Sequence, residues 1–386
     1  MKRMTAALLA LFLLCLTPAY AAGAEAEAQS SAALTITAPS GILMEKTTGT
    51  ILYEKDAHTQ YEPASVTKVM TLLLVMEAID AGQLAWEDMV TASAHAISMG
   101  GSQIWLKENE QLSVRDMVKA VAVVSANDCA VALAEHVAGS EEAFVALMNQ
   151  RASELGMEHT HFLNCTGLPA SGHVTCAYDI ALMSRALILN HPETREFTTI
   201  WMDTLRDGQF QLSNTNKLIR FYEGATGLKT GSTDSALYCL SATAERDGME
   251  LIAVVMHAPT SNDRFESAKV LLNYGFANYT LLPVYPDQAL APVEVLLGEQ
   301  ATVQPVTSRE CAILVEKSQA GSVTTQLSLA DSVEAPVEQG QKLGELQVYV
   351  DGQLRDTIDL VAAQPVERLS MGGIFKDLLG KLFMAG

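Results

Sequence analysis

The sequence predicts an α/β (α+β) fold in which an antiparallel sheet lies beside a cluster of helices, followed by a small all-β domain. Two β-rich hairpins, at residues 41–55 and 236–257, flank a helix-rich stretch. Strands that follow each other in hairpins pair antiparallel, so the sheet is at least partly antiparallel. After Pro283, residues 290–362 are rich in β-branched residues and turn signals, which indicates a separate all-β unit.

Composition and charge limit the classes of function. The chain has 386 residues, 18% charged and 49% hydrophobic, a globular composition long enough for two or three domains. Lys and Arg number 25 against 45 Asp and Glu, and the net charge of −20 disfavours nucleic acid as a partner. Six Cys are too few for a disulfide scaffold. We expect five of them to be small buried apolar side chains: Cys129, Cys165, Cys176, Cys239 and Cys311.

The first 21 residues have the pattern of a signal peptide. Lys2 and Arg3 form a basic start, residues 5–17 are apolar, and Ala19-Tyr20-Ala21 offers small residues around a cleavage site. We therefore expect an exported protein. Residues 22–35, mostly Ala, Glu, Gln and Ser, predict a disordered spacer.

The helix-rich stretch begins after Pro63, since proline is favoured in the first turn of a helix. The helix predicted over residues 65–81 is apolar on every side, which is typical of a helix buried in the protein centre. Ser113 with Asp116 is a capping-box-like start for the next helix. Further predicted helices cover residues 114–124, 128–137, 141–155, 177–189 and 264–274, the last of which ends before Gly275.

The carboxyl-terminal part predicts short strands and then a terminal helix. The strands include residues 300–306, 311–316 and 347–350, and a turn at Asp351-Gly352 leads into another strand. Residues 371–386 place large apolar side chains on one helical face, which is too short to span a bilayer but long enough to lie in its interface. The alternative is that this helix docks onto the β domain or onto a partner subunit.

Three short motifs carry residues suited to chemistry: Ser65-Val66-Thr67-Lys68, Ser125-Ala126-Asn127 and Lys229-Thr230-Gly231. Ser65 and Lys68 are one helical turn apart and face the same side. A serine hydroxyl is a weak nucleophile until a base takes its proton, and burial lowers the pKa of a lysine so that it can be that base. The start of the helix also offers free N–H groups to an oxyanion.

The other two motifs supply groups for a peptide substrate. Ser125 stands where the chain turns between two helices and can relay a proton to a leaving amine, while Asn127 can hold a substrate amide. Lys229 and Thr230 offer a cation and a hydroxyl on a strand edge along which a peptide can lie, and Gly231 allows close backbone approach. Ser-x-x-Lys or Ser-x-Asn alone is common and Lys-Thr-Gly is rarer, but the three in this order and context indicate a nucleophilic serine enzyme.

With these motifs the chain resembles the low-molecular-mass penicillin-binding proteins that are serine-type D-alanyl-D-alanine carboxypeptidases, peptidase family S11. The resemblance covers roughly residues 36–386 and implies a β-lactamase/transpeptidase-like catalytic domain. Where some members carry His after Lys-Thr-Gly, this chain has Ser232. Beyond the three motifs, the similar segments are residues 61–64, 164–169, 175–179, 227–234, 264–265, 271–272, 275–276 and 337–344.

The resemblance implies the catalytic roles. Ser65 attacks the carbonyl of the terminal D-Ala-D-Ala bond and forms an acyl-enzyme, with Lys68 as general base. Ser125 helps to pass the proton to the departing D-alanine. The backbone N–H groups of Ser65 and Ser232 form the oxyanion hole, and water then releases the shortened peptide.

The same resemblance assigns the substrate-binding residues. Lys229 and Thr230 bind the carboxylate region of the substrate, with Arg264 nearby. Asn127 and Gly231 complete the predicted substrate-binding set. No cofactor is expected, and the expected partners are a peptidoglycan stem peptide ending in D-Ala-D-Ala and the β-lactam antibiotics. The membrane surface is a third expected partner, through the C-terminal helix, and the expected location is the outer face of the cytoplasmic membrane.

The predicted organisation has five parts. They are a signal peptide (1–21), a disordered spacer (22–35), the catalytic domain (36–285), a β-rich C-terminal domain (286–366) and an amphipathic membrane-anchor helix (367–386). We expect no metal site, because His159 and His161 are followed by no third ligand at a suitable spacing.

Two rival functions are open to the same fold. A β-lactamase needs a water positioned by glutamate for fast deacylation, and no Glu-x-x-Leu-Asn run stands between the second and third motifs. A catalytically silent wall-binding protein is the second rival, and the intact Ser65, Lys68, Ser125 and Lys229 argue against it.

Overall fold

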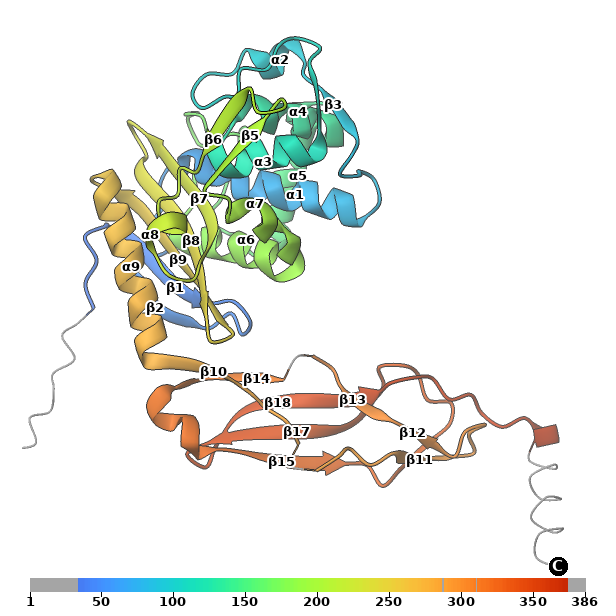
Figure 1. The fold of residues 1–386 in the computed structure, drawn as a ribbon. Helices are drawn as coiled ribbons and strands as arrows, with labels where there is room; N and C mark the ends of the chain where they lie inside the picture. The colour runs from blue at the N-terminus through green and yellow to red at the C-terminus, as the bar shows by residue number, and fades with distance from the viewer. Residues whose placement is uncertain (1–33, 287, 310, 374–386) are drawn as a thin grey trace, which may run out of the picture. The chain divides into compact units, whose positions relative to one another are not determined.

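The computed structural model describes residues 34–286, 288–309 and 311–373. The predicted signal peptide lies outside these residues, as do nearly all of the predicted spacer and the predicted terminal helix from residue 374 onward. The described chain contains an α/β part, residues 34–278, and a β part that begins at residue 279 (Figure 1). No helix among the described residues combines the length and the apolar character needed to cross a membrane.

The α/β part is built on a five-stranded sheet in the order β2-β1-β9-β8-β7, in which every neighbouring pair is antiparallel. Both predicted hairpins are confirmed, as β1 with β2 and as β8 with β9. The central strand β9 is almost wholly buried because α9 packs on one face of the sheet and α6 on the other (Figure 1), and β7 is an edge strand. The strands are β1 (Ser40–Glu45), β2 (Ile51–Lys55), β7 (Ala225–Thr233), β8 (Leu237–Arg246) and β9 (Met249–Ala258).

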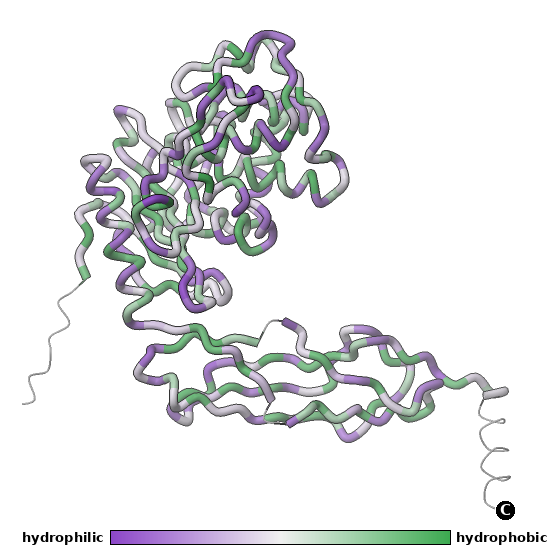
Figure 2. The backbone as a smooth tube through the Cα atoms, viewed as in Figure 1, coloured by the Kyte–Doolittle hydropathy of each residue, from purple (hydrophilic) through white to green (hydrophobic). Residues whose placement is uncertain are grey.

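The helical cluster surrounds one apolar helix. The predicted helix over 65–81 starts as a 3-10 turn, η1 (Ala64–Thr67), and continues as α1 (Lys68–Asp80), which is buried along most of its length. It packs against the helices α3 to α6, and Figure 2 shows hydrophobic residues running through this part while hydrophilic ones gather in outer turns. These neighbours confirm the predicted helices: α3 (Val114–Val124), α4 (Asn127–Ala138), α5 (Glu141–Glu154) and α6 (Ala177–Asn190).

Several short elements of the α/β part were absent from the sequence prediction, because runs of three or four residues show no clear periodicity. Two small hairpins, β3 with β4 and β5 with β6, lie outside the main sheet. The short elements are β3 (Met89–Thr91), α2 (Ala94–Ile97), β4 (Gln111–Ser113), η2 (Pro192–Thr194), α7 (Arg195–Thr198), β5 (Met202–Leu205), β6 (Phe210–Ser213) and α8 (Leu218–Phe221).

The helix predicted over 264–274 is longer at both ends, and the prediction that it stops before Gly275 is wrong. Helix α9 (Ser261–Asn278) begins after Thr260, whose Oγ1 accepts a hydrogen bond from the N–H of Asp263 at 3.1 Å. Gly275 lies inside the helix, where a Cβ would stand 2.4 Å from Leu251 Cδ1. The glycine therefore permits close packing of helix on sheet instead of ending the helix.

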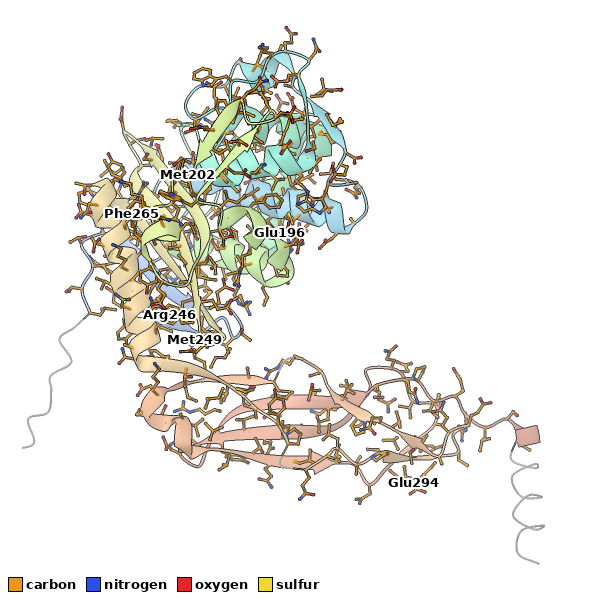
Figure 3. The ribbon with its side chains drawn as sticks, viewed as in Figure 1. Glu196, Met202, Arg246, Met249, Phe265 and Glu294 are labelled. Carbon is orange, nitrogen blue, oxygen red and sulfur yellow. The ribbon has the colours of Figure 1, made fainter. Side chains whose placement is uncertain are left out.

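The turn between β8 and β9 is tied to the same helix. Arg246 and Met249 stand on either side of this turn, and Phe265 lies on α9 (Figure 3). The guanidinium carbon of Arg246 lies 4.7 Å from the ring centre of Phe276 on α9. This cation–π contact fastens the tip of the predicted hairpin to the helix that covers its sheet.

The β part confirms the predicted all-β unit. It contains a four-stranded sheet in the order β13-β18-β17-β15, a three-stranded sheet β12-β11-β16 and the pair β10-β14, with two clusters of buried apolar side chains. The predicted turn at Asp351-Gly352 joins β17 to β18. Its elements are β10 (Tyr279–Pro283), β11 (Val293–Leu296), β12 (Thr302–Val303), β13 (Pro305–Thr307), β14 (Ala312–Glu316), η3 (Lys317–Ser322), β15 (Val323–Leu329), β16 (Ser332–Glu334), β17 (Lys342–Val350) and β18 (Gln353–Ala362).

The five cysteines of the described residues are all free thiols. Four are buried, which confirms the prediction that they act as small apolar side chains, whereas Cys311 is only half-buried. The buried four are Cys129, Cys165, Cys176 and Cys239.

We expect Gly275→Val to lower the free energy of unfolding by about 1–3 kcal/mol, because the added side chain must displace Leu251 in a close-packed interface. Ala277→Val, two residues along the same helix at an exposed position, is the matched control and should cost only about 0.5 kcal/mol through helix propensity. Urea unfolding of the two variants measures the difference. A loss at Gly275→Val no larger than at Ala277→Val would show that Leu251 moves aside without penalty and that close packing does not select glycine here.

Candidate active site

Ser65 lies in a tight turn that leads directly into the buried helix. It is the second residue of η1, and Ala64 before it has φ +48°, a backbone angle that residues other than glycine rarely adopt. Three residues on, Lys68 begins α1, and its Nζ lies 3.0 Å from Ser65 Oγ. Side chains at i and i+3 of a 3-10 turn lie one above the other, so the turn itself aligns the hydroxyl and the amine.

The amine of Lys68 is enclosed by the protein. Its side chain is fully buried, and Nζ also donates a hydrogen bond of 2.7 Å to the carbonyl oxygen of Thr166. Burial lowers the pKa of Lys68 to about 7, although Cys165 and Asp128 nearby act to raise it. A substantial fraction of the amine is therefore uncharged near neutral pH, which is what a general base requires.

The loop that contains Asn164 fixes the Thr166 carbonyl in place. Asn164 Oδ1 accepts hydrogen bonds from the backbone N–H groups of Thr166 (3.2 Å) and Gly167 (2.7 Å), and its Nδ2 donates to the carbonyl of Leu168 at 2.9 Å. Gly167 has φ +79°, and a Cβ there would stand 1.8 Å from the carbonyl oxygen of Ala64. The backbone of this loop therefore lies directly against the backbone of the Ser65 turn.

The third motif lies on the edge strand β7, directly beside the Ser65 turn. A Cβ at Gly231 would stand 2.8 Å from the carbonyl oxygen of Pro63 and 2.9 Å from the backbone nitrogen of Ser65. Lys229 is buried two residues earlier on the same strand, and its Nζ donates to the carbonyl of Thr230 at 3.0 Å. The missing side chain at Gly231 is what allows strand and turn to meet.

Lys229 lies in an environment that disfavours its charge. Burial lowers the pKa of Lys229 well below its ordinary value, and the neighbouring Lys68 and Arg264 lower it further. Lys68 and Arg264 thus lie close enough to Lys229 to repel its positive charge. An anion bound among them would relieve that repulsion.

Arg264 reaches the third motif from helix α9. Its Nη1 donates hydrogen bonds to the carbonyl oxygens of Gly231 (3.0 Å) and Cys239 (3.4 Å), and its guanidinium stacks on the rings of Tyr238 and Phe265. Burial is the main reason why the pKa of Arg264 is lowered. The side chain is therefore anchored to the backbone of β7 and β8.

The second motif forms the joint between α3 and α4. Ser125 ends α3 with φ +64°, and Asn127 begins α4, where its Nδ2 donates to the carbonyl of Gly100 at 2.7 Å. Ser125 Oγ and Asn127 Oδ1 are buried and have no hydrogen-bond partner among the described residues. Buried polar atoms normally have partners, so these two are candidates for contacts to a ligand.

Thr215 joins the second motif to the third. Its backbone N–H donates to the carbonyl of Val123 at 3.1 Å, near the end of α3, and its Oγ1 accepts a hydrogen bond from Thr230 Oγ1 at 2.7 Å. Thr215 was not predicted from the sequence, because a single threonine outside the three motifs gives no signal. The structure thus brings Ser65, Lys68, Lys229, Thr230, Gly231 and Arg264 together. Thr215 links this group to Val123, which lies just before the joint that carries Ser125 and Asn127. Ser232 follows Gly231 on β7, where it is exposed.

The chain matches known proteins along nearly its whole length. The family of D-alanyl-D-alanine carboxypeptidases, peptidase S11, matches residues 25–260, and the C-terminal domain of penicillin-binding protein 5 matches residues 280–368. The D-alanyl-D-alanine carboxypeptidase DacF of Bacillus subtilis is 39% identical over 98% of both chains.

Solved structures agree with these matches. Penicillin-binding protein 5 from Haemophilus influenzae has a TM-score of 0.74 at 30% identity and covers 86% of this chain and 98% of its own. Penicillin-binding protein D2 from Listeria monocytogenes, in its ampicillin-bound form, has a TM-score of 0.58 at 34% identity and covers 63% of this chain and 99% of its own. This chain belongs to peptidase family S11, the serine-type D-alanyl-D-alanine carboxypeptidases among the penicillin-binding proteins.

We expect Gly167→Ala to destabilise the protein by at least about 2 kcal/mol more than Gly172→Ala. Both glycines have positive φ, which costs alanine about 1–2 kcal/mol, but only at Gly167 does the added Cβ meet backbone atoms, whereas at Gly172 it lies 3.8 Å from a Leu163 methyl. Denaturant unfolding of the two variants gives the comparison. Similar stabilities would mean that the loop moves away from the Ser65 turn without penalty.

Proposed function

We propose that this carboxypeptidase uses Ser65 as its nucleophile and Lys68 as its general base. The observation that carries the proposal is the 3.0 Å separation of Lys68 Nζ from Ser65 Oγ, together with the burial that lowers the pKa of Lys68 to about 7. Lys68 accepts the hydroxyl proton as Oγ attacks the carbonyl carbon of the terminal D-Ala-D-Ala bond. The bond to the amide nitrogen then breaks, leaving the shortened peptide as an ester on Ser65.

The negative charge that develops on the carbonyl oxygen requires N–H donors. In our proposal these are the backbone N–H groups of Ser65 and Ser232. The close approach of Gly231 to the Ser65 turn supports this assignment, since it brings the two backbone segments into contact. Fixed backbone donors of this kind stabilise the transition state without reorganisation.

The proposed leaving-group path uses the second motif. Ser125 passes the proton from Lys68 to the nitrogen of the departing D-alanine, and Asn127 holds an amide of the substrate. The absence of partners for Ser125 Oγ and Asn127 Oδ1 among the described residues supports these roles, because a substrate supplies the missing partners.

The proposed binding site for the free carboxylate of the substrate is made by Lys229 and Thr230. A carboxylate raises the pKa of Lys229 again and restores its charge, so the site favours peptides that end in a free carboxylate. Arg264 acts as a positioning residue, because it holds the carbonyl of Gly231 while contributing positive charge. Thr215 is also a positioning residue, because its hydroxyl accepts a hydrogen bond from the hydroxyl of Thr230.

The proposed substrate is the pentapeptide stem of peptidoglycan, and β-lactams acylate the same Ser65. Water enters after D-alanine has left and hydrolyses the ester. The ampicillin-bound form of the Listeria relative supports the β-lactam assignment. Penicillin turnover separates this function from the β-lactamase rival: a long-lived acyl-enzyme supports a carboxypeptidase, and rapid release of hydrolysed drug supports the rival. D-Alanine release from a peptide ending in D-Ala-D-Ala excludes a silent wall-binding protein.

We further propose that the protein acts at the outer face of the cytoplasmic membrane and that residues 367–386 hold it there. The membrane-binding segment from residue 374 onward lies outside the described residues, so the support is the apolar face of its sequence. The predicted domain boundaries likewise stay a prediction.

Ser65→Ala should abolish both D-alanine release and covalent labelling by a fluorescent penicillin, because it removes the attacking oxygen. Mass spectrometry of the penicillin-treated wild type should locate the adduct on the peptide that contains Ser65. The control is Ser153→Ala, an exposed serine on α5, which should label as the wild type does. Labelling that survives in Ser65→Ala would exclude this nucleophile.

The second-order rate of acylation by penicillin should rise up to about tenfold per pH unit below pH 7 and level off above it. The reason is that Lys68, with a lowered pKa of about 7, acts in its uncharged form, which becomes complete as the pH rises through that value. Lys68→Arg, which stays protonated, should be inactive across the range. Stopped-flow labelling from pH 5 to 9 measures the profile, and a rate independent of pH in the wild type would contradict the assignment of the base.

A further inference from the structure

Three potential metal ligands from separate segments meet in the α/β part, and none of them is a residue of the proposed active site. They are His58, His159 and Cys176, and their ligand atoms all lie within 4.8 Å of one another. Cys176 is fully buried, His159 is half-buried and His58 is exposed. A site with one buried and one exposed edge is accessible to an ion from solvent.

The fold holds these side chains in place through neighbouring contacts. Cys176 caps helix α6, and its Sγ accepts a hydrogen bond from the N–H of Asp179 at 3.4 Å. Asp179 Oδ2 in turn accepts from the backbone N–H of His159 at 2.9 Å. The ring of His58 lies 4.7 Å from that of Tyr178 and 5.4 Å from that of His159. The helix cap, the Asp179 carboxylate and the tilted ring contacts thus hold the three candidate ligands near one another.

A second observation favours a cation at this point. Asp179 is fully buried, yet its Oδ1 has no hydrogen-bond partner among the described residues. A buried carboxylate that is only partly satisfied is costly, and a nearby cation offsets that cost. The Cys176 thiol interacts with this carboxylate, but neither the thiol nor the two imidazoles supply a positive charge while they are neutral, whereas a bound metal does.

We propose that His58, His159 and Cys176 form a zinc-binding site, with water in the fourth coordination position and Asp179 as the neighbouring negative charge. Two imidazole nitrogens and one sulfur suit Zn²⁺, which prefers four tetrahedral ligands of this kind. Zinc–nitrogen bonds of about 2.0–2.1 Å and a zinc–sulfur bond of about 2.3 Å place the ligand atoms about 3.5 Å apart. Rotation of the exposed His58 side chain closes the remaining gap.

The proton balance of binding is simple. Burial raises the pKa of the Cys176 thiol to about 12, so the metal-free thiol keeps its proton at neutral pH. Zinc replaces that proton, which leaves to solvent, and the sulfur binds as a thiolate. The thiolate and the Asp179 carboxylate together then balance the two positive charges of the ion.

Another group of potential ligands has a simpler explanation. Asp80, His191 and Glu193 also lie close together. There, His191 Nδ1 lies 2.9 Å from Asp80 Oδ2, and this contact between an imidazole and an exposed carboxylate accounts for the arrangement although it lacks hydrogen-bond geometry. Asp80 is exposed, and no buried charge is left without compensation.

The proposed zinc site would reinforce a backbone connection close to the active site. Tyr61 and Thr175 exchange backbone hydrogen bonds of 2.8 and 2.9 Å. His58 lies three residues before Tyr61, and Cys176 directly follows Thr175. Zinc would therefore clamp the segment that leads to Ser65 onto the segment that leads to α6. This inference does not depend on the proposed catalytic roles.

The test is metal binding by the purified full chain after chelator treatment. Calorimetric titration should show one Zn²⁺ per chain, and Co²⁺ should give a thiolate-to-metal charge-transfer absorption in the near ultraviolet. Cys176→Ser should lose that absorption, and His159→Gln should weaken zinc binding by at least about tenfold. Serine is itself a favoured helix cap, so Cys176→Ser should preserve the fold.

The matched control is His161→Gln, an exposed histidine two residues from His159, which should bind zinc as the wild type does. His58→Gln changes an exposed residue and so tests the site without disturbing the core. Absence of stoichiometric zinc binding, or equal affinities for wild type, His58→Gln and His159→Gln, would overturn the proposal. D-Alanine release is measured separately, so failure of the zinc site would leave the proposed function untouched.

Discussion

The amine of Lys68 is held 3.0 Å from the Ser65 hydroxyl and 2.7 Å from the Thr166 carbonyl, with its side chain removed from solvent. Burying an ionisable amine destabilises a protein, because the charged form loses its hydration. The surrounding structure offsets this cost with the Thr166 carbonyl, which Asn164 fixes in place, and the lowered pKa of about 7 lets the amine lose its proton. The amine must stay buried and in line with the Ser65 hydroxyl. This requirement explains why the Ser65 turn, the Asn164 loop and β7 pack against one another.

Much of the fold could be predicted from the sequence because its long elements carry clear composition, start and stop signals. The apolar helix after Pro63, the helices α3 to α6 and both hairpins of the sheet lie close to their predicted positions. The end of helix α9 was predicted wrongly at Gly275 for a physical reason. A glycine that lets a helix pack closely on a sheet cannot be distinguished, in a single sequence, from a glycine that ends a helix. The small hairpins formed by β3 to β6 were missed because strands this short carry too few residues to show alternation.

The site was predicted less completely than the fold. Ser65 with Lys68, and the third motif, have spacings that a single turn or strand explains. The structure added the Thr166 carbonyl, Thr215 and the anchoring of Arg264 to Gly231, all of which are contacts between distant segments through backbone or single hydroxyl groups. The cluster of His58, His159 and Cys176 was not predicted for the same reason. Its three residues are far apart in the sequence, and metal ligands are predicted from regular spacing along the chain. Contacts that depend on tertiary structure leave little trace in local sequence.

The bare backbone at Gly231 has a consequence for drug resistance. A microbe often escapes an inhibitor by enlarging a residue that the inhibitor touches but the natural ligand tolerates. Here an added side chain would collide with the carbonyl oxygen of Pro63 and the backbone nitrogen of Ser65, so enlargement would damage the enzyme itself. Under the proposed mechanism the drug and the wall peptide also meet the same main-chain atoms, which no substitution removes. A substitution at Gly231 is therefore not a route to resistance, and insensitivity to an inhibitor would have to arise from changes at other residues.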